Sequence, residues 1–389
     1  ATKPQVLLSR CCRGSCSGRV HASAEVAEGA ATGPAALVTT GSGDKEASAV
    51  LEKALRIQWT HGFPHAPAGM TQLTHGTHSY PAGMNPAVAA ALWEVLPGQS
   101  VLDPFMGSGT TLIEGLRSGR RCVGSDASPL ACFVAAHQTW CCTEGEREAL
   151  LAAAERAAAA AAAAGETIGD FAPLRGAVEV ERAAFDTPSS SGSAHLDPLL
   201  FVFSVALQKG ERVRAAKRKG RKGSARHRGQ PPSRLFLDAA ADYAERLRAL
   251  EDAAPADPAL ELSLCDAREL ALASGSVDAI LTSPPYPAVY DYISLARSTR
   301  ALVGGAGVAS AAASFAATAV PDGRAWPAEW SSAEREIGAF KSLKRDCYGF
   351  AERWQRDQEA WLGRCAAALG RGGRAAVLVG DGAAINTRE

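Results

Sequence analysis

The chain has 389 residues, with 41 Lys and Arg side chains against 41 Asp and Glu side chains, and 47% of its residues are hydrophobic. This length allows one to three domains, and the balanced charge leaves nucleic-acid binding to a local patch rather than to the chain as a whole. No apolar run approaches the ~20 residues that a membrane span needs, so we expect no membrane partner. The ten cysteines include no C-x-x-C pair and no zinc-finger spacing. They therefore predict free thiols in a reducing compartment and no metal site, with a CC-x3-C cluster near the start as a weak alternative.

The first 24 residues contain no Asp or Glu and carry Lys and Arg among several serines. This composition is typical of organelle transit peptides, and the alternative is a disordered tail. We therefore expect residues 1–45 to lie outside the fold and 41–50 to form a linker. The expected location is a plastid or mitochondrion, with the nucleus or the cytoplasm of a prokaryote as alternatives.

Regular structure is predicted from residue 51 onward. Residues 85–96 have helical apolar spacing, with Asn85 as the N-cap and Pro86 at the first helical position. Residues 100–126 then read as a strand, a glycine-rich turn, a helix and a second strand. This is a βαβ unit, so residues 51–140 are expected to form the first part of an α/β domain.

Residues 141–260 are predicted to be an insertion of helical and irregular structure. Its alanine-rich stretch favours a helix that buries little and serves as a spacer. Nine Lys or Arg residues and no acid occur at 212–228. This run has three interpretations: phosphate contacts with a nucleic acid, a nuclear import signal, or a solvated loop. The first interpretation makes five residues candidates for nucleic-acid binding: Lys217, Arg218, Lys219, Arg221 and Lys222.

Residues 261–389 read as strand, acidic turn, short helix and strand, followed by a helix and a final strand. They are the second part of the α/β domain. The predicted fold is therefore a doubly wound α/β sheet interrupted by a large insertion.

A cofactor site is indicated by the sequence "DPFMGSGTT" at residues 103–111. Glycines after a first strand let the backbone approach a ligand closely, and the following helix offers free N–H groups. The dinucleotide pattern G-x-G-x-x-G fails, because Leu112 stands three positions after Gly109. Asp126 and Asp266 end later strands, where carboxylates bind ribose hydroxyls or an adenine amine. A nucleoside cofactor without phosphates, S-adenosylmethionine, fits this pattern best.

The motifs "DPFMGSGTT", "VGSDASPLA", "LCDAREL" and "ILTSPPY" together resemble the amino-methylating DNA methyltransferases, which modify cytosine N4 or adenine N6. "HSYPAGMNP" is similar to the segment before the glycine loop in that family. The resemblance covers roughly residues 73–140 and 262–381, and it implies a Rossmann-like sheet, DNA as partner and a flipped target base. It also implies these cofactor-binding residues: Tyr80, Asp103, Phe105, Gly107, Ser108, Gly109, Thr110, Asp126 and Asp266.

The same resemblance makes the corner "SPPY" the reaction centre. An exocyclic amine is a poor nucleophile and has to be held close to the methyl group. Ser283 Oγ and the Pro284 carbonyl are the expected acceptors of its hydrogens, and Pro285 helps to fix the corner in advance. Tyr286 is expected to stack on the flipped base, whereas Tyr290 either lines the pocket or packs in the core. No covalent intermediate is needed, and the absence of a Pro-Cys dipeptide argues against C5 methylation.

Several alternatives stay open. A serine at the start of the corner favours cytosine N4, with adenine N6 as the alternative. An RNA base methyltransferase on the same fold is the second hypothesis, and a non-enzymatic nucleic-acid binder is the third; the intact motifs disfavour the third. Sheets of this family usually continue with an antiparallel hairpin after the last predicted strand. We therefore expect either a fragment or a sheet that is closed in another way.

Overall fold

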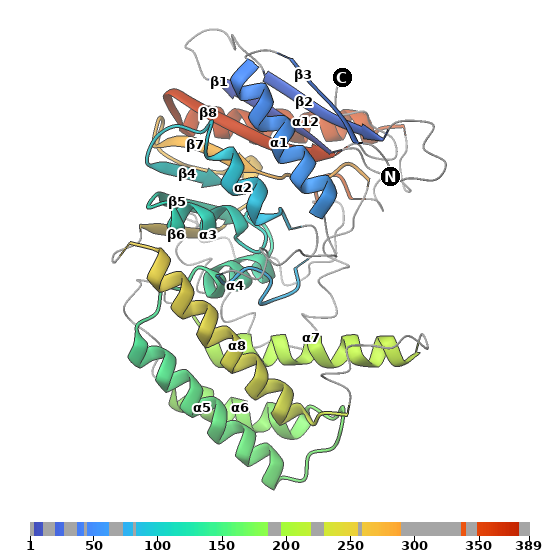
Figure 1. Ribbon diagram of the computed structural model, residues 1–389, viewed down its shortest axis with the longest axis vertical. Coiled ribbons are helices and arrows are strands. Elements are labelled where there is room, and N and C mark those ends of the chain that lie inside the picture. The colour runs from blue at the N-terminus through green and yellow to red at the C-terminus, as the bar shows by residue number, and fades with distance from the viewer. Residues whose placement is uncertain are drawn as a thin grey trace.

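The computed structural model describes residues 4–10, 20–26, 37–42, 45–61, 73–80, 83–185, 196–218, 229–255, 259–288, 336–339 and 348–380. Within these residues the chain forms an eight-stranded sheet with helices on both faces. A bundle of long helices lies beyond one edge of this sheet (Figure 1).

Five neighbouring strands of the sheet are parallel, in the order β8-β7-β4-β5-β6. These strands are β4 (Ser100–Asp103), β5 (Arg121–Asp126), β6 (Leu260–Leu264), β7 (Val277–Thr282) and β8 (Leu369–Gly380). Within these five strands the chain begins at the central β4, moves outward to β5 and β6, and then returns to β7 on the other side of β4. The predicted doubly wound α/β fold is confirmed. Its topological switch point, where such sheets bind ligands, lies between the carboxyl ends of β4 and β7.

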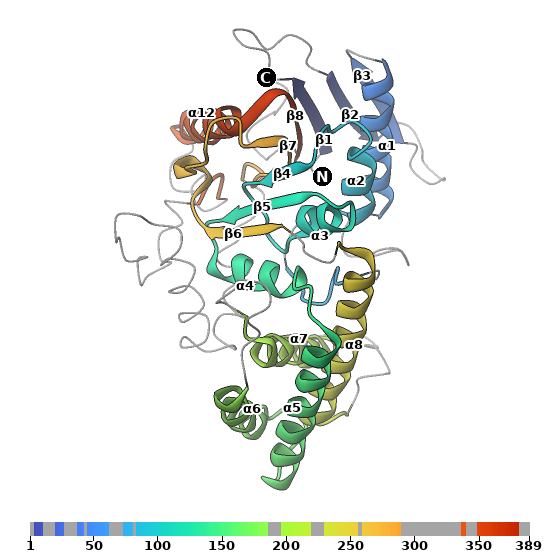
Figure 2. The same ribbon diagram turned by 90° about the vertical axis from the view of Figure 1, so that its left-hand side faces the viewer.

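The helices next to the sheet cover its two faces. They are α1 (Lys45–His61), α2 (Pro86–Leu92), α3 (Thr110–Arg117), α4 (Pro129–Gln138) and α12 (Phe350–Ala368). Figure 2 shows α1, α2 and α3 on one side of the sheet and α12 on the other. Alternate strand residues follow this division, because Val101 packs with the first group whereas Leu102 packs with Trp361 of α12.

The predicted helix at residues 85–96 forms as α2 but ends earlier, at Leu92. Asn85 is its N-cap as expected, and Asn85 Oδ1 accepts a hydrogen bond of 2.9 Å from the Ala87 amide. Pro86 occupies the first helical position, where its missing N–H costs nothing.

The N-terminal residues contribute to the sheet, which differs from our expectation that residues 1–45 lie outside the fold. They form β1 (Pro4–Arg10), β2 (Val20–Val26) and β3 (Leu37–Ser42), an antiparallel series whose first strand pairs antiparallel with β8. α1 likewise begins within the expected linker. Pairing with β1 satisfies the backbone groups along the edge of β8, which composition alone does not reveal. The sheet is thus continued by antiparallel strands from the start of the chain.

The insertion is a helical bundle packed below β6 and α4 (Figure 1). Its helices are α5 (Glu144–Ala163), α6 (Ala172–Ala184), α7 (Pro198–Arg218) and α8 (Pro232–Ala253). The alanine-rich α5 is not a spacer. Five of its alanines are buried, and it packs along α6 and α8. Small side chains allow the helix axes to approach closely. The helices are then held together by many close contacts rather than by a few large side chains.

Buried polar contacts fix the bundle to α4. His137 stacks on Phe201 of α7, with ring centroids 4.8 Å apart and planes 3° from parallel. Its Nε2 accepts a hydrogen bond of 2.8 Å from the Asp197 amide, and its carbonyl accepts one of 2.7 Å from Tyr243 Oη of α8. Burial lowers the pKa of His137 to about 4, so the imidazole stays neutral and accepts at Nε2 at physiological pH. Among the helices described, none is both long and apolar enough to cross a membrane.

Candidate active site

A buried hydrogen bond joins two predicted motifs at the switch point. Asp103 is the last residue of β4, and Thr282 is the last residue of β7. Thr282 Oγ1 donates to Asp103 Oδ1 over 2.7 Å, and the two residues are 0% and 4% exposed. The parallel pairing of β4 with β7 brings these strand ends together. The glycine-rich loop and the S-P-P-Y corner therefore start from one fixed point.

The carboxyl group of Asp103 is electrostatically unusual. Burial raises its pKa to about 6, because the charged form loses its hydration. Hydrogen bonds from Thr282, Thr111 and the Phe105 amide partly oppose this effect. Asp103 thus gains a proton more readily than an exposed aspartate.

The glycine-rich loop is shaped by backbone conformations that favour glycine. Gly107 has φ 50° and Gly109 has φ 85°, both in the left-handed region. Gly109 is the N-cap of α3 and supplies no side-chain cap, so the first turn of α3 leaves N–H groups for a ligand. A Cβ atom at Gly107 would lie 3.4 Å from Cε1 of Tyr80. The Tyr80 ring therefore borders this loop.

Asp126 at the end of β5 holds the loop from the other side. Its Oδ2 accepts a hydrogen bond of 3.0 Å from the Gly107 amide, and its Oδ1 accepts one of 2.8 Å from the Ser128 amide. Burial raises the pKa of Asp126 to about 6; the two amides oppose this rise, and the charges of Asp103 and Asp266 add to it. Three predicted cofactor carboxylates are thus close enough to interact at one edge of the sheet.

Asp266 follows β6 and forms an ion pair with Arg268. Asp266 Oδ1 accepts a hydrogen bond of 3.0 Å from Arg268 Nε, and Asp266 Oδ2 accepts one of 2.6 Å from Arg268 Nη2. Arg268 Nη1 also donates to Asp357 of α12 over 2.7 Å. A bidentate guanidinium fixes the carboxylate plane and leaves lone pairs for a further donor.

The S-P-P-Y corner directly follows Thr282. Ser283 Oγ donates to Tyr286 Oη over 3.4 Å, so the tyrosine ring folds back and both hydroxyls border the same space. Pro284 is buried, whereas Ser283 and Tyr286 are partly exposed. Just beyond the corner, Ala288 has φ 55°, and its amide donates to the Gly338 carbonyl over 2.8 Å. This strained exit shows that the corner is held from both ends.

The remaining predicted residues lie in the glycine loop and at the start of α3, at the end of α7, or outside the described part of the chain. Phe105 packs edge-on against Trp361 with ring centroids 5.2 Å apart, and the Ser108 carbonyl accepts a hydrogen bond from Gln138 Nε2. Thr110 is the buried first residue of α3. Lys217 and Arg218 are the last two residues of α7. Four lie outside the described residues: Lys219, Arg221, Lys222 and Tyr290.

Sequence reasoning missed several residues that order the site. Thr282 was detectable in principle, because it precedes the corner and ends a strand that neighbours β4. Arg268 was also visible, two positions after Asp266. Gln138 gave no signal, since polar residues on helices are usually solvated.

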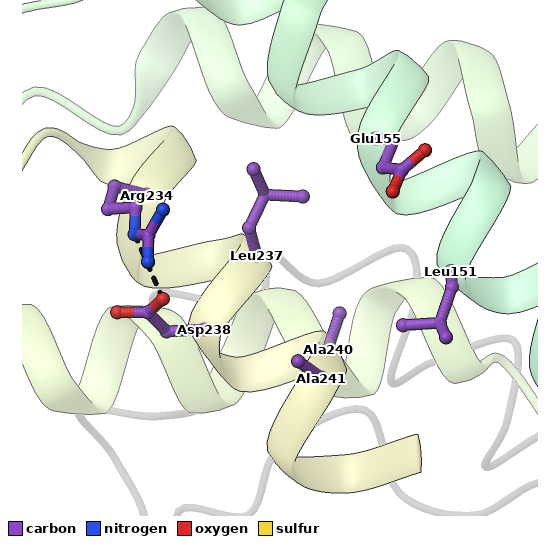
Figure 3. Close-up of a pocket in the computed structure, with 7 residues that line it drawn as sticks. All are labelled: Leu151, Glu155, Arg234, Leu237, Asp238, Ala240 and Ala241. Carbon is purple, nitrogen blue, oxygen red and sulfur yellow. Dashed lines mark ion pairs between the residues drawn. The ribbon is translucent and has the colours of Figure 1, made fainter. Parts of the chain in front are cut away.

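A separate hollow of about 240 Å³ lies on the helical bundle between α5 and α8 (Figure 3). Its lining consists of Leu151, Glu155, Arg234, Leu237, Asp238, Ala240 and Ala241. Arg234 and Asp238 form an ion pair of 3.0 Å at its rim. This hollow contains none of the predicted cofactor or catalytic residues.

The carboxylates, glycine loop and helix N-terminus together fit a ligand with amino and hydroxyl hydrogens. The carboxylates of Asp103 and Asp126 disfavour a diphosphate, because the like charges would repel each other. In the described part of the chain, no group of three or more His, Cys, Asp or Glu side chains is placed to hold a metal ion. Residues 83–136 match the family model of a DNA methylase, named for N6 and N4 methylation.

This matched segment contains α2, β4, the glycine loop, α3, β5 and most of α4. The match supports an amino-methyltransferase enzyme that acts on DNA. The S-P-P-Y corner lies outside it, and the model's name covers both amines. No protein of curated function and no solved structure matched the chain.

The substitution Thr282→Val tests the link between the two motifs. Valine keeps the shape but removes the hydroxyl that donates to Asp103, so we expect the pKa of Asp103 to rise further. At pH 7 the free energy of unfolding should fall by about 1–3 kcal/mol, because a buried carboxylate loses a partner. Urea denaturation measures this change. Thr282→Ser should restore most of the loss, and equal stability of Thr282→Val and the unmodified protein would contradict the link.

Proposed function

We propose that the protein is an S-adenosylmethionine-dependent methyltransferase that modifies the exocyclic N4 amine of cytosine in DNA by direct attack. The observation that carries this proposal is the bond between Thr282 and Asp103. This bond fixes the glycine loop and the S-P-P-Y corner side by side at the switch point, which supports a cofactor role for the loop and an amine-binding role for the corner. Adenine N6 is the alternative target, because the same acceptors suit either amine.

The cofactor half of the site is assigned from its hydrogen-bonding groups. Asp126 would accept from the ribose hydroxyls and Asp266 from the adenine amino group, while Gly107 gives the backbone room to approach the ligand. Tyr80 closes the loop on its other side. When bound, S-adenosylmethionine supplies a methyl group activated by a positively charged sulfur. The carboxylates of Asp103 and Asp126 suit that positive charge.

The corner half of the site orients the amine. Ser283 Oγ and the Pro284 carbonyl accept its two hydrogens, which directs the nitrogen lone pair towards the methyl carbon. Pro285 has no N–H, so no amide hydrogen at that position competes for these acceptors. Tyr286 offers a ring face on which the flipped base stacks. Because the two prolines fix the corner beforehand, little conformational entropy is lost when the base enters.

The choice of cytosine is supported by Ser283. In the family that the motifs resemble, members with serine at this position more often methylate cytosine N4, and those with aspartate or asparagine usually methylate adenine N6. A serine hydroxyl both donates and accepts, so it also suits the ring nitrogen beside the amine, which is an acceptor in cytosine and in adenine alike.

Nucleoside mass spectrometry tests the proposal. The protein is incubated with methyl-labelled S-adenosylmethionine and duplex DNA or RNA, and the products are digested to nucleosides. We expect labelled N4-methylcytosine from DNA. Labelled N6-methyladenine would transfer the assignment to the alternative amine, and label in RNA alone would contradict DNA as the substrate.

The basic end of α7 is proposed to contact the DNA backbone. Figure 1 shows α7 projecting beyond the rest of the bundle, and Arg212 and Arg214 are exposed residues in the second half of this helix. Arg214 lies 5.9 Å from the centroid of Phe171 and forms an ion pair with Glu211, so its position is fixed. Each arginine that neutralises a phosphate makes affinity more dependent on salt.

We therefore expect the double substitution Arg212→Gln and Arg214→Gln to weaken DNA binding and to flatten its salt dependence. The slope of log affinity against log salt concentration should fall in magnitude by about 2, one for each lost phosphate contact. Fluorescence anisotropy at several salt concentrations measures this slope. Arg248→Gln, which alters an exposed arginine on α8, is the matched control and should leave the slope unchanged. An unchanged slope in the double variant would remove α7 from the interface.

A further inference from the structure

One side chain of the helical insertion reaches the segment that covers the glycine loop. Gln208 of α7 accepts a hydrogen bond of 2.9 Å from the Ser79 amide at its Oε1 and donates one of 3.0 Å to the Ser79 carbonyl from its Nε2. It therefore satisfies both main-chain groups of Ser79, much as a neighbouring strand would. The two residues are 129 positions apart, so this contact exists only when the insertion is folded against the sheet domain.

Ser79 directly precedes Tyr80, and the Tyr80 side chain borders Gly107. Tyr80 is only 9% exposed, so its ring position follows closely from the backbone that carries it. A shift of the Ser79 backbone would move the ring relative to the glycine loop. Gln208 therefore acts on the loop through Tyr80.

A second glutamine holds the same segment from the side of the sheet. Gln138 ends α4, and its Oε1 accepts from the His78 amide over 3.4 Å. Its Nε2 donates to the Ser108 carbonyl in the glycine loop, and its own carbonyl accepts from Thr74 Oγ1. The segment before the glycine loop is thus fixed to α4 on one side and to α7 on the other.

The α7 helix is a firm support for this contact. Its residues from Leu199 to Leu207 are all buried. Gly210, two positions beyond Gln208, lies so close to Phe171 that a Cβ atom there would stand 2.9 Å from the ring. Gln208 consequently projects from a helix whose position is set by the packing of the bundle.

We propose that Gln208 is a positioning residue for the cofactor, which holds Tyr80 over the glycine loop and makes S-adenosylmethionine binding depend on the helical insertion. This inference rests on the proposed function, in which Tyr80 and Gly107 line the cofactor site. It makes the insertion part of the cofactor site rather than a separate module.

The test uses Gln208→Leu, which keeps the volume of the side chain and removes both hydrogen bonds. We expect the dissociation constant for S-adenosylhomocysteine, measured by calorimetry, to rise roughly tenfold, the size expected for two partly buried hydrogen bonds. The KM for S-adenosylmethionine should rise equally, while kcat at saturation stays within about twofold. Glu245→Gln, which alters an exposed residue on α8 of the same bundle, is the control and should change neither constant. Gln208→Ala replaces the leucine variant if that variant does not fold.

A double-mutant cycle shows whether Gln208 acts through Tyr80. If it does, Gln208→Leu should have little further effect in a Tyr80→Leu background. Hydrogen exchange at the Ser79 amide should also become faster in Gln208→Leu. Unchanged affinity in Gln208→Leu, or losses that simply multiply in the double variant, would overturn the proposal. If the unmodified protein itself fails to bind S-adenosylhomocysteine, the proposed function is overturned and this inference with it.

Discussion

Replacing Ser283 and Pro284 together with alanine is expected to abolish methyl transfer and to leave the affinity for S-adenosylhomocysteine within about twofold. The change removes the serine hydroxyl that we propose accepts an amine hydrogen, and it loosens the corner that would present the neighbouring carbonyl. Loss of one fixed polar group at a reaction centre typically costs about 10²–10³ in kcat. The loss of preorganisation adds to this, so we expect a fall of roughly 10³ or more.

The single variants separate the two contributions. Ser283→Ala should lower kcat roughly 10²-fold and leave the carbonyl acceptor in place. Pro284→Ala should have the smaller effect, because its carbonyl stays and only the stiffness of the corner is lost. Single-turnover kinetics with labelled S-adenosylmethionine measures these rates, and calorimetry checks the cofactor affinity. Full activity in the double variant would show that other groups hold the amine. Loss of cofactor affinity would place the corner within the cofactor site instead.

The positions of the site residues followed from local sequence patterns. A short apolar strand, a glycine-rich turn and an acid at the next strand end are each local features. Parallel strands place their carboxyl ends at one edge, so Asp103, Asp126 and Asp266 were expected to lie together. The structure places them close enough to affect one another's charge. The motif order alone was therefore enough to predict that these three carboxylates lie close together.

Features that depend on contacts between distant residues were not predictable in this way. The pairing of β1 with β8 joins residues more than 360 positions apart, such as Leu7 and Val377. Nothing in an acid-free, serine-containing stretch indicates that its strands are completed by the far end of the chain. The alanines of α5 are similar, because alanine suits both a solvated helix and a tightly packed one, and the partner helices decide between them.

Gln208 shows the same limit within the site. On a helix, a glutamine next to Lys209 looks like part of a solvated face. Its role depends on where the Ser79 backbone lies, and that is set by the packing of two separate segments. Thr282 is an intermediate case, since the strand order that brings it to Asp103 follows from the doubly wound topology.

The contribution of Asp103 to the stability of the ligand-free protein should decrease as the pH rises from about 4 to about 6. Asp103 has its pKa raised from 3.8 to about 6 by burial, so in this range the folded protein keeps a proton that the unfolded chain has lost. The contribution of Asp103 to folding is thus complete below pH 4 and is lost as the pH rises through 6. A pKa change of this size corresponds to about 3 kcal/mol. Asp126 acts in the same direction, but its partial exposure makes its effect smaller.

The substitution Asp103→Asn isolates this effect, because asparagine keeps the carbonyl that accepts from Thr282 and cannot ionise. Urea denaturation at pH 4.5, 5.5, 6.5 and 7.5 should show that its stability relative to the unmodified protein increases with pH, by about 2 kcal/mol over the range. Asp278→Asn is the control, because the pKa of Asp278 is shifted in the opposite direction from that of Asp103. Hydrogen bonds from Ser100 and from the Gln99 and Ser100 amides outweigh burial and lower the pKa of Asp278.

The Asp278 carboxylate is therefore charged in both states throughout the measured range, so Asp278→Asn should lower stability by the same amount at each pH. If the free energy of unfolding of Asp103→Asn instead changes with pH in the same way as that of the unmodified protein, Asp103 does not hold a proton in the folded state. The Thr282 hydroxyl would then donate to a permanent carboxylate. The charge at the switch point would be fixed at −1 from pH 4.5 upward, and S-adenosylhomocysteine affinity should then show no dependence on the ionisation of Asp103.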